Sequence, residues 1–314
     1  MSKKIIRWVL AHEPIELFLR AGRRFSDEIY AKTNGDVEIE IMTVSEYSAK
    51  YNGGKPVNRL ELLDLMNAGK IEMSQMYTTS LAKFEKDMSA LDLPFLFRNH
   101  DHASKVLDGP IGKDLFSKLA QKSNIQGLAF TYSGGFRMIA GTKPIQKIED
   151  FKGLKIRTAH SPVAEATFRA VGAEPVPMNL EDLNEEIGSG NLHGGESTYP
   201  RFFSMKQNEV STVVSDTQHS LFLTSILVNS KFWNSLNEDL RQIMQNSAQV
   251  AAIQERKESI DDISNVQNQC KEAGISIVTL PEAEKNQFKS ATAKVYEQFE
   301  PIFSSGLVKK IIAS

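Results

Sequence analysis

A stretch near the carboxyl end, from about Asn237 to Ala273, contains neither proline nor glycine. Its apolar side chains, such as Leu240, Met244 and Ala251, keep a helical period. At about 1.5 Å per residue, a helix of roughly 36 residues is about 54 Å long. That is longer than one lobe of a protein this size, so we expect the helix to span two lobes.

The chain also alternates predicted strands and helices. Its 314 residues exceed what one hydrophobic core usually serves, so two domains are expected. Strands are predicted at residues 5–10, 37–41 and 71–76, with helices at 15–33 and 59–68 between them. This order predicts an α/β fold with parallel strands and helices packed on them. The segment SEYSAKYNGGKP is rich in turn residues and is predicted to form a loop.

A second run of alternating elements extends to about residue 212, and the pattern changes after Asp216, where a strand-like run leads into the long helix. Strands are predicted at residues 125–132, 136–139, 154–157, 220–230 and 275–280, and helices at 161–171, at 180–189 and from Pro281 onward. Gly194-Gly195 is interpreted as a turn.

Charge and cysteine content exclude several classes of function. The formal net charge is −2, which argues against nucleic acid as a partner. The chain lacks a run of about 18 apolar residues that could cross a bilayer. Cys270 stands alone, which excludes an intramolecular disulfide and a thiolate metal site. The apolar run before His12 is too short for a signal-peptide core, so the protein is either cytoplasmic or a mature form without its leader.

Nucleotide- and metal-binding motifs are missing from the sequence. It contains no GxxxxGK[ST], no GxGxxG after a strand, no HExxH and no GxSxG. His100-Asp101-His102 is interpreted as a solvated helix cap rather than a metal site, and lone histidines such as His193 and His219 are more often structural. No cofactor and no metal are predicted.

Two arginines, Arg137 and Arg157, lie in short runs with the alternation of a strand. A guanidinium presents a planar fork that matches a carboxylate. The partner of each arginine is therefore either an anionic ligand or a structural acid, for example Glu149, Asp150, Glu181 or Glu196. Spacing alone favours the structural pairing.

The stretch GFRMIAGTKPIQKIEDFKGLKIRT resembles the signature region of the solute-binding proteins of tripartite ATP-independent periplasmic (TRAP) transporters, the DctP type. VGAEPVPM, LNEEIGSGNLHGGEST and FFSMKQNEV continue the resemblance. Upstream, WVLAHEP, TNGDVEIEIM, LMNAGKIEM and LDLPFLF match in order, and TQHSLFLTSILVNSKFWNSL matches downstream. The resemblance covers essentially the whole chain.

The resemblance implies a two-lobed periplasmic binding protein fold, type II-like, with a long helix spanning both lobes. Lobe I is expected to comprise residues 1–126 plus 216–253, and lobe II residues 127–215 plus 254–314. A small organic acid is expected to bind in the cleft between them, and the lobes then close on it about crossovers near 125–130 and 211–216.

The same resemblance implies the partners and location of the protein. It is expected to be a monomer in the periplasm, its signal peptide removed, that delivers its ligand to TRAP permease subunits and binds no nucleic acid. It is not expected to be an enzyme, since no acid–base pair or nucleophile stands at a known spacing. The alternatives are a binding module for a sensor kinase and an enzyme acting on an organic acid.

The resemblance also implies the site residues. Arg157 of the KIR motif inherits the main ion pair with the ligand carboxylate, and Arg137 follows as its helper. Where relatives commonly read DGQENP, this chain reads HGGEST, so Ser197 replaces an amide and His193 an acid. The remaining candidates for the cleft are His12, Glu13, Tyr77, Met178, Leu180, Glu196, Tyr199 and His219.

Overall fold

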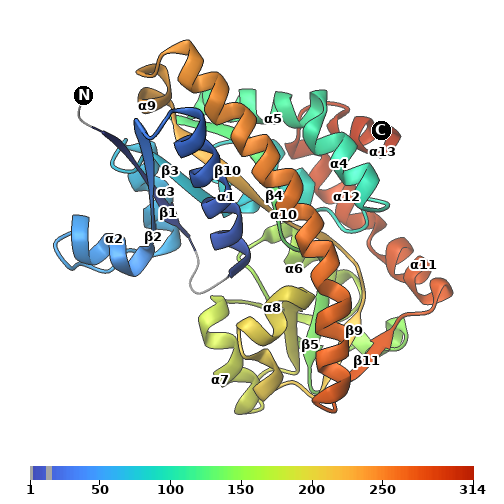
Figure 1. Ribbon diagram of the computed structural model, residues 1–314. Coiled ribbons are helices and arrows are strands. Elements are labelled where there is room, and N and C mark those ends of the chain that lie inside the picture. The colour runs from blue at the N-terminus through green and yellow to red at the C-terminus, as the bar shows by residue number, and fades with distance from the viewer. Residues whose placement is uncertain (1–2, 12–15) are drawn as a thin grey trace. The chain divides into compact units, whose positions relative to one another are not determined.

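The computed structural model describes residues 3–11 and 16–314, apart from the side chains of residues 59 and 60 (Figure 1). The chain divides into two compact units. The first contains the chain up to Glu85 with residues 104–132 and 223–258, and the second contains residues 86–103, 133–222 and 259–314. The predicted α/β class is confirmed, because each unit has its own sheet with helices packed on it.

The sheet of the first unit has the strand order β2-β1-β3-β10-β4. Its strands are β1 (Lys4–Leu10), β2 (Val37–Thr43), β3 (Met73–Tyr77), β4 (Ile125–Phe136) and β10 (Leu221–Asn229). β1 pairs in parallel with β2 and β3, as the β-α-β-α-β order predicts, and β10 runs antiparallel to β3. The last residues of β4 and the first of β10 belong to the second unit.

Helix α1 (Glu16–Lys32) shows why this sheet forms. Its apolar residues recur every three or four positions, so they share one face, and that face is buried. The Phe25 ring meets Trp8 of β1 edge to face, with 5.1 Å between ring centroids. The other helices with residues in this unit are α2 (Val44–Tyr51), α3 (Arg59–Asn67), α4 (His100–Asp108), α5 (Pro110–Lys122), α9 (Ser230–Asn234) and α10 (Glu238–Glu272).

Helix α2 corrects the predicted loop at SEYSAKYNGGKP. Thr43 caps the helix: its Oγ1 accepts a hydrogen bond from Glu46 N at 3.2 Å, and Glu46 Oε2 accepts one from Thr43 N at 2.8 Å. This reciprocal capping box satisfies two backbone donors that a helix start leaves unpaired. The turn residues Asn52, Gly53 and Gly54 lie after the helix.

The second unit contains a mixed sheet with the order β11-β9-β5-β8-β6-β7. Its strands are β5 (Met138–Gly141), β6 (Lys155–Thr158), β7 (Glu174–Pro177), β8 (Gly194–Ser197), β9 (Val213–Asp216) and β11 (Ser276–Thr279). β6 is parallel to β7 and β8, whereas β5 is antiparallel to β8 and β9. The helices are α6 (Pro162–Ala170), α7 (Leu183–Gly188), α8 (Tyr199–Ser204), α11 (Glu282–Ala291), α12 (Ala293–Phe299) and α13 (Leu307–Ala313).

Two further predictions for this unit are wrong. Gly194-Gly195 is not a turn but the start of β8, where an added Cβ on Gly194 would lie 2.7 Å from Ala140 O, so glycine permits the close approach of β5. The single helix predicted from Pro281 is instead three helices, because Thr292 ends the first and Pro301 lies in the turn after the second.

Helix α10, drawn in orange in Figure 1, confirms the predicted long helix. It has 35 residues and contributes to both units, up to Glu258 in the first and from Ser259 in the second. Gly274 follows it with φ +72°, a conformation that glycine adopts at little cost and that ends a helix.

The expected first lobe includes residues 86–103, whereas their contacts lie with the second unit. Phe95 N donates a hydrogen bond to His219 O at 2.7 Å. The Phe95 ring also packs against Phe288, with 5.0 Å between centroids, and Phe288 packs on Phe151. The apolar run LDLPFLF thus supplies core to the sheet of the second unit.

Phe288 is a sensitive point of that core because its side chain is fully buried between Phe95 and Phe151. We expect Phe288→Ala to lower the free energy of unfolding by about 3–5 kcal/mol, since it leaves a cavity. Chemical denaturation followed by circular dichroism measures this. The matched control is Ile312→Ala in α13, whose side chain is 48% exposed and should change stability by less than about 0.5 kcal/mol. Equal effects of the two substitutions would contradict the packing described.

Candidate functional site

Arg157 lies at the carboxyl end of β6, between β7 and β8. Its backbone partners are Val176 and Gly195, and its side chain is 5% exposed. Arg157 Nε and Nη2 both donate to the carbonyl oxygen of Met178, at 3.0 and 2.8 Å. This fork-like contact fixes the plane of the guanidinium, which has five N–H donors in all.

Gly195 allows Arg157 and Leu183 to pack closely against β8. An added Cβ at Gly195 would lie 2.8 Å from Leu183 Cδ1 and 3.1 Å from Arg157 Cβ. A larger residue would therefore displace Leu183 or Arg157. Leu183, Leu180 and their buried neighbours Ile187 and Leu192 form an apolar cluster beside this end of the sheet, with Met178 packed against it.

Ser197 ends β8 and is fully buried. Its Oγ has no hydrogen-bond partner within the described ranges 3–11 and 16–314. Because side chains alternate along a strand, Ser197 shares a face of the sheet with Gly195 and with Arg157, the partner of Gly195. The sheet therefore places Arg157 and Ser197 on the same face of neighbouring strands.

Arg137 lies just before β5 and is held in a different setting. Its N–H donates to Ser220 O at 2.8 Å, and its carbonyl accepts from Gln218 N at 3.0 Å. The guanidinium lies over the Phe222 ring, 3.7 Å from the centroid. Its charge faces two buried acids: Nη2 is 3.5 Å from Asp92 Oδ1, and Nε is 3.8 Å from Glu196 Oε1. Glu196 is one of the structural acids that spacing alone allowed.

Glu196 and His219 complete this buried group. The ionised Glu196 accepts a hydrogen bond from His219 Nε2 at 3.0 Å, and His219 Nδ1 lies 2.7 Å from Thr217 Oγ1. Burial alone would raise the pKa of Glu196, but the Arg137 guanidinium, the His219 hydrogen bond and the charge of Arg157 outweigh it. They lower the pKa of Glu196 from 4.5 to about 2.

Asp92 is a member of this group that the sequence reading missed. It is buried, and Ser161 Oγ donates a hydrogen bond to its Oδ2 at 2.6 Å. Burial raises the pKa of Asp92, against the opposing charge of Arg137 and the hydrogen bond from Ser161. The available signal was an acid inside the apolar run LDLPFLF, since a buried carboxylate needs a partner.

The remaining predicted residues belong to both units. Tyr199 is buried in an apolar cluster with Met138 and Phe202, and Tyr77 ends β3 of the first unit, half-buried. His12 and Glu13 lie outside the described residues. A ligand role for each candidate, including Arg137, Glu196 and His219, stays a prediction.

The histidines do not behave as a solvated cap. His102 is buried, and its Nε2 hydrogen-bonds to Ile311 O at 2.8 Å, which corrects the prediction. His193 Nδ1 accepts a hydrogen bond from Lys155 N at 2.9 Å.

In the parts of the chain that are described, no three histidine, cysteine or acidic side chains are grouped as a metal site. No helix among the described residues is long and apolar enough to cross a membrane.

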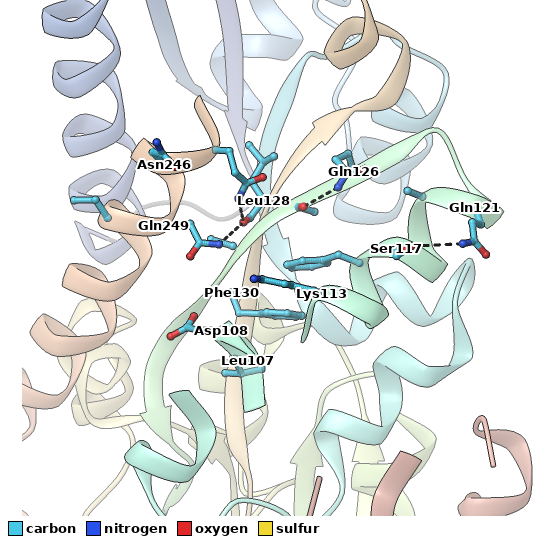
Figure 2. A pocket seen from close by; sticks show the side chains of 16 residues that line it. Leu107, Asp108, Lys113, Ser117, Gln121, Gln126, Leu128, Phe130, Asn246 and Gln249 are labelled. Carbon is cyan, nitrogen blue, oxygen red and sulfur yellow. Dashed lines mark hydrogen bonds between the residues drawn. The ribbon is translucent and has the colours of Figure 1, made fainter. Parts of the chain in front are cut away.

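A separate groove lies in the first unit, with a volume of about 850 Å³ (Figure 2). Side chains of α5 and α10 flank it, and β4 runs along it. The rings of Phe116 and Phe130 stack there, 4.0 Å apart. None of the residues predicted to bind a ligand lines this groove.

Known proteins resemble the whole chain. A family model described as bacterial extracellular solute-binding protein, family 7, matches residues 12–301. The 2,3-diketo-L-gulonate-binding periplasmic protein of Escherichia coli is 29% identical over 260 residues, which cover 82% of this chain and 76% of that protein. The C4-dicarboxylate-binding periplasmic protein of Rhodobacter capsulatus is 32% identical over 227 residues, which cover 71% of this chain and 64% of that protein.

Among solved structures, a TRAP periplasmic solute-binding protein from a Polaromonas species, bound to D-erythronate, superposes with a TM-score of 0.87. It is 28% identical, and the match covers 99% of each chain. The predicted family and two-lobed fold are thereby confirmed. The chain belongs to the bacterial extracellular solute-binding protein family 7, the DctP family of TRAP transporter solute-binding proteins.

Proposed function

We propose that this protein captures a small organic acid outside the cytoplasm and delivers it to the permease of a TRAP transporter. Family membership and the named ligands of its relatives, all carboxylates or their derivatives, support this role. The observation that carries it in the structure is Arg157, a buried guanidinium whose plane is fixed by Met178 O. The family and the structural neighbours are solute-binding proteins, which favours binding without turnover.

Arg157 is proposed as the anchor for the ligand carboxylate. A guanidinium held in place loses little conformational freedom when it binds, and its geometry matches a carboxylate. Two charge-assisted hydrogen bonds contribute about 1.5–3 kcal/mol each. Ser197 lies on the same face of the sheet as Arg157, and its buried hydroxyl has no partner among the described residues.

Arg157→Ala should therefore weaken the binding of organic acids by about 100-fold or more. Calorimetry with a panel of carboxylates, after removal of any acid that copurifies, measures the loss. The control is Arg169→Ala, because Arg169 is an exposed arginine of the same unit that pairs with Glu165 along α6. An unchanged affinity in Arg157→Ala would exclude the anchor.

We propose a structural role for Arg137, which is an alternative to its predicted role as the helper of the anchor. Its charge already faces Asp92 and Glu196 inside the unit, and its guanidinium covers Phe222. Removing one partner of a buried ion pair leaves the other charge uncompensated, which is costly. The Glu196 carboxylate should therefore stabilise the fold, whether or not a ligand is bound.

The stabilisation of the fold by Glu196 depends on pH. The pKa of Glu196 is lower in the folded protein than in the unfolded chain, so its contribution is complete above about 4.5 and is lost as the pH falls towards 2. The difference between 4.5 and about 2 corresponds to about 3 kcal/mol. Glu196→Gln should lower the free energy of unfolding by about this much at pH 7, and by roughly half as much at pH 3.

Denaturant titrations at both pH values test this expectation. Glu149→Gln, which changes an exposed carboxylate of the same unit, is the control and should have little effect at either pH. A loss in Glu196→Gln that is the same at pH 7 and pH 3 would show that the charge of Glu196 is not what stabilises the fold.

Binding between the two units, followed by their closure, stays a prediction for this chain. Bending about the segments where the chain passes from one unit to the other is the motion expected for such proteins. Small-angle scattering should show a smaller radius of gyration once a tight ligand is added. The same radius with and without ligand would count against closure.

The rival functions are separated by simple observations. An enzyme acting on an organic acid would convert the bound molecule, whereas a binding protein should release it intact for mass spectrometry. A binding module for a sensor kinase would share the same site, and a neighbouring gene for a permease pair or for a kinase distinguishes the two. A periplasmic location and a monomeric state are part of the proposal.

A further inference from the structure

We propose that the acid bound at Arg157 carries a single carboxylate and a neighbouring hydroxyl group, and that Ser197 recognises this hydroxyl. The inference rests on the proposed function and narrows it to one chemical class. The relatives named above bind acids of different classes, a C4-dicarboxylate in one case and D-erythronate in another, so the class does not follow from family membership.

The register of the sheet places the carboxylate anchor, Arg157, and the hydroxyl of Ser197 on the same face of neighbouring strands. Arg157 on β6 is the partner of Gly195 on β8, and Ser197 follows two residues later on the same face. Gly195 contributes no side chain between them. A serine side chain is short, so it can contact only a ligand atom close to the strand. A carboxylate held at Arg157 would bring its neighbouring carbon atoms within that reach.

The Ser197 hydroxyl needs a hydrogen-bond partner. It is fully buried, and no described residue hydrogen-bonds to its Oγ. Buried polar groups in folded proteins are almost always hydrogen-bonded, to protein, water or ligand. A hydroxyl both donates and accepts, so it pairs well with another hydroxyl, which has the same capacity.

The charged groups of the second unit argue against a second carboxylate on a ligand bound at Arg157. The two other buried arginines of the unit, Arg137 and Arg201, lie over the Phe222 ring, at 3.7 and 5.2 Å from its centroid. Arg137 faces its own acids, and Arg201 donates to Ser133 Oγ at 2.9 Å.

A neighbouring fixed negative charge, that of Glu196, is also unfavourable to a second carboxylate. Glu196 stays ionised and is close enough to Arg157 for the two charges to interact, so it repels further negative charge there. Leu180 and Leu183 contribute only apolar surface on the other side. An uncharged, hydroxylated chain suits these surroundings better than a dicarboxylate.

Four acids, each with four carbon atoms, test the two features of the ligand separately: the single carboxylate and the hydroxyl group. D-Erythronate has one carboxylate and hydroxyls, butanoate has one carboxylate alone, succinate has two carboxylates, and tartrate has two carboxylates and hydroxyls. Calorimetry measures the affinity of the full chain for each acid. The chain is first unfolded and refolded, which removes any retained acid. D-Erythronate should bind at least tenfold more tightly than each of the other three, because only it satisfies both requirements.

Ser197→Ala then tests the residue. It should weaken D-erythronate binding by roughly tenfold and leave butanoate binding unchanged, since only the hydroxyl contact is lost. The matched control is Ser211→Ala, which removes another buried serine hydroxyl of the same unit that lacks a partner among the described residues. It should leave both affinities unchanged, and thermal melting confirms that both variants are folded.

The outcomes distinguish this inference from the proposed function. Succinate or tartrate binding as tightly as D-erythronate would overturn the inference and leave the proposed function in place. An unchanged D-erythronate affinity in Ser197→Ala would show that Ser197 holds water or nothing, and would also overturn it. If none of the four acids binds, the inference fails. If no acid of a broad carboxylate panel binds either, the proposed function fails as well.

Discussion

The structure of the second unit depends on the buried ion pair between Arg137 and Glu196. Arg137 precedes β5 and Glu196 lies on β8, so the pair links neighbouring strands, and His219 adds the segment before β10. A buried charge is tolerated only where it is neutralised, and here the neutralising group is supplied by the protein itself. Arg157, at the end of β6, is held in another way, because its Nε and Nη2 donate to the backbone carbonyl of Met178.

Much of the fold follows from sequence pattern. The long helix, the parallel start of the first sheet and most strands were predictable because periodicity and glycine stops are local signals. The failures have local physical causes as well. Helix α2 depends on the capping box of Thr43 and Glu46 within a segment of turn-like composition, and Gly194 serves a close strand approach that no local pattern reveals.

The site was harder to predict because it depends on contacts between distant segments. Spacing alone could not decide whether Arg137 faces a ligand or an acid, and Asp92, which faces it, comes from a run that reads as apolar core. The resemblance to TRAP solute-binding proteins singled out Arg157, but it could not show that Met178 O fixes the guanidinium. Nor could sequence show that Ser197, the departure from the family motif, keeps its hydroxyl buried on the face of Arg157.

A crystal structure of the protein with the acid that it retains, or with an added one, tests the central claim most directly. The account predicts both oxygens of a ligand carboxylate at about 2.7–2.9 Å from the nitrogens of Arg157. It also predicts that Arg137 remains beside Glu196 and Asp92. A ligand carboxylate bound to Arg137, with Glu196 displaced, or an acid bound away from Arg157 would contradict it.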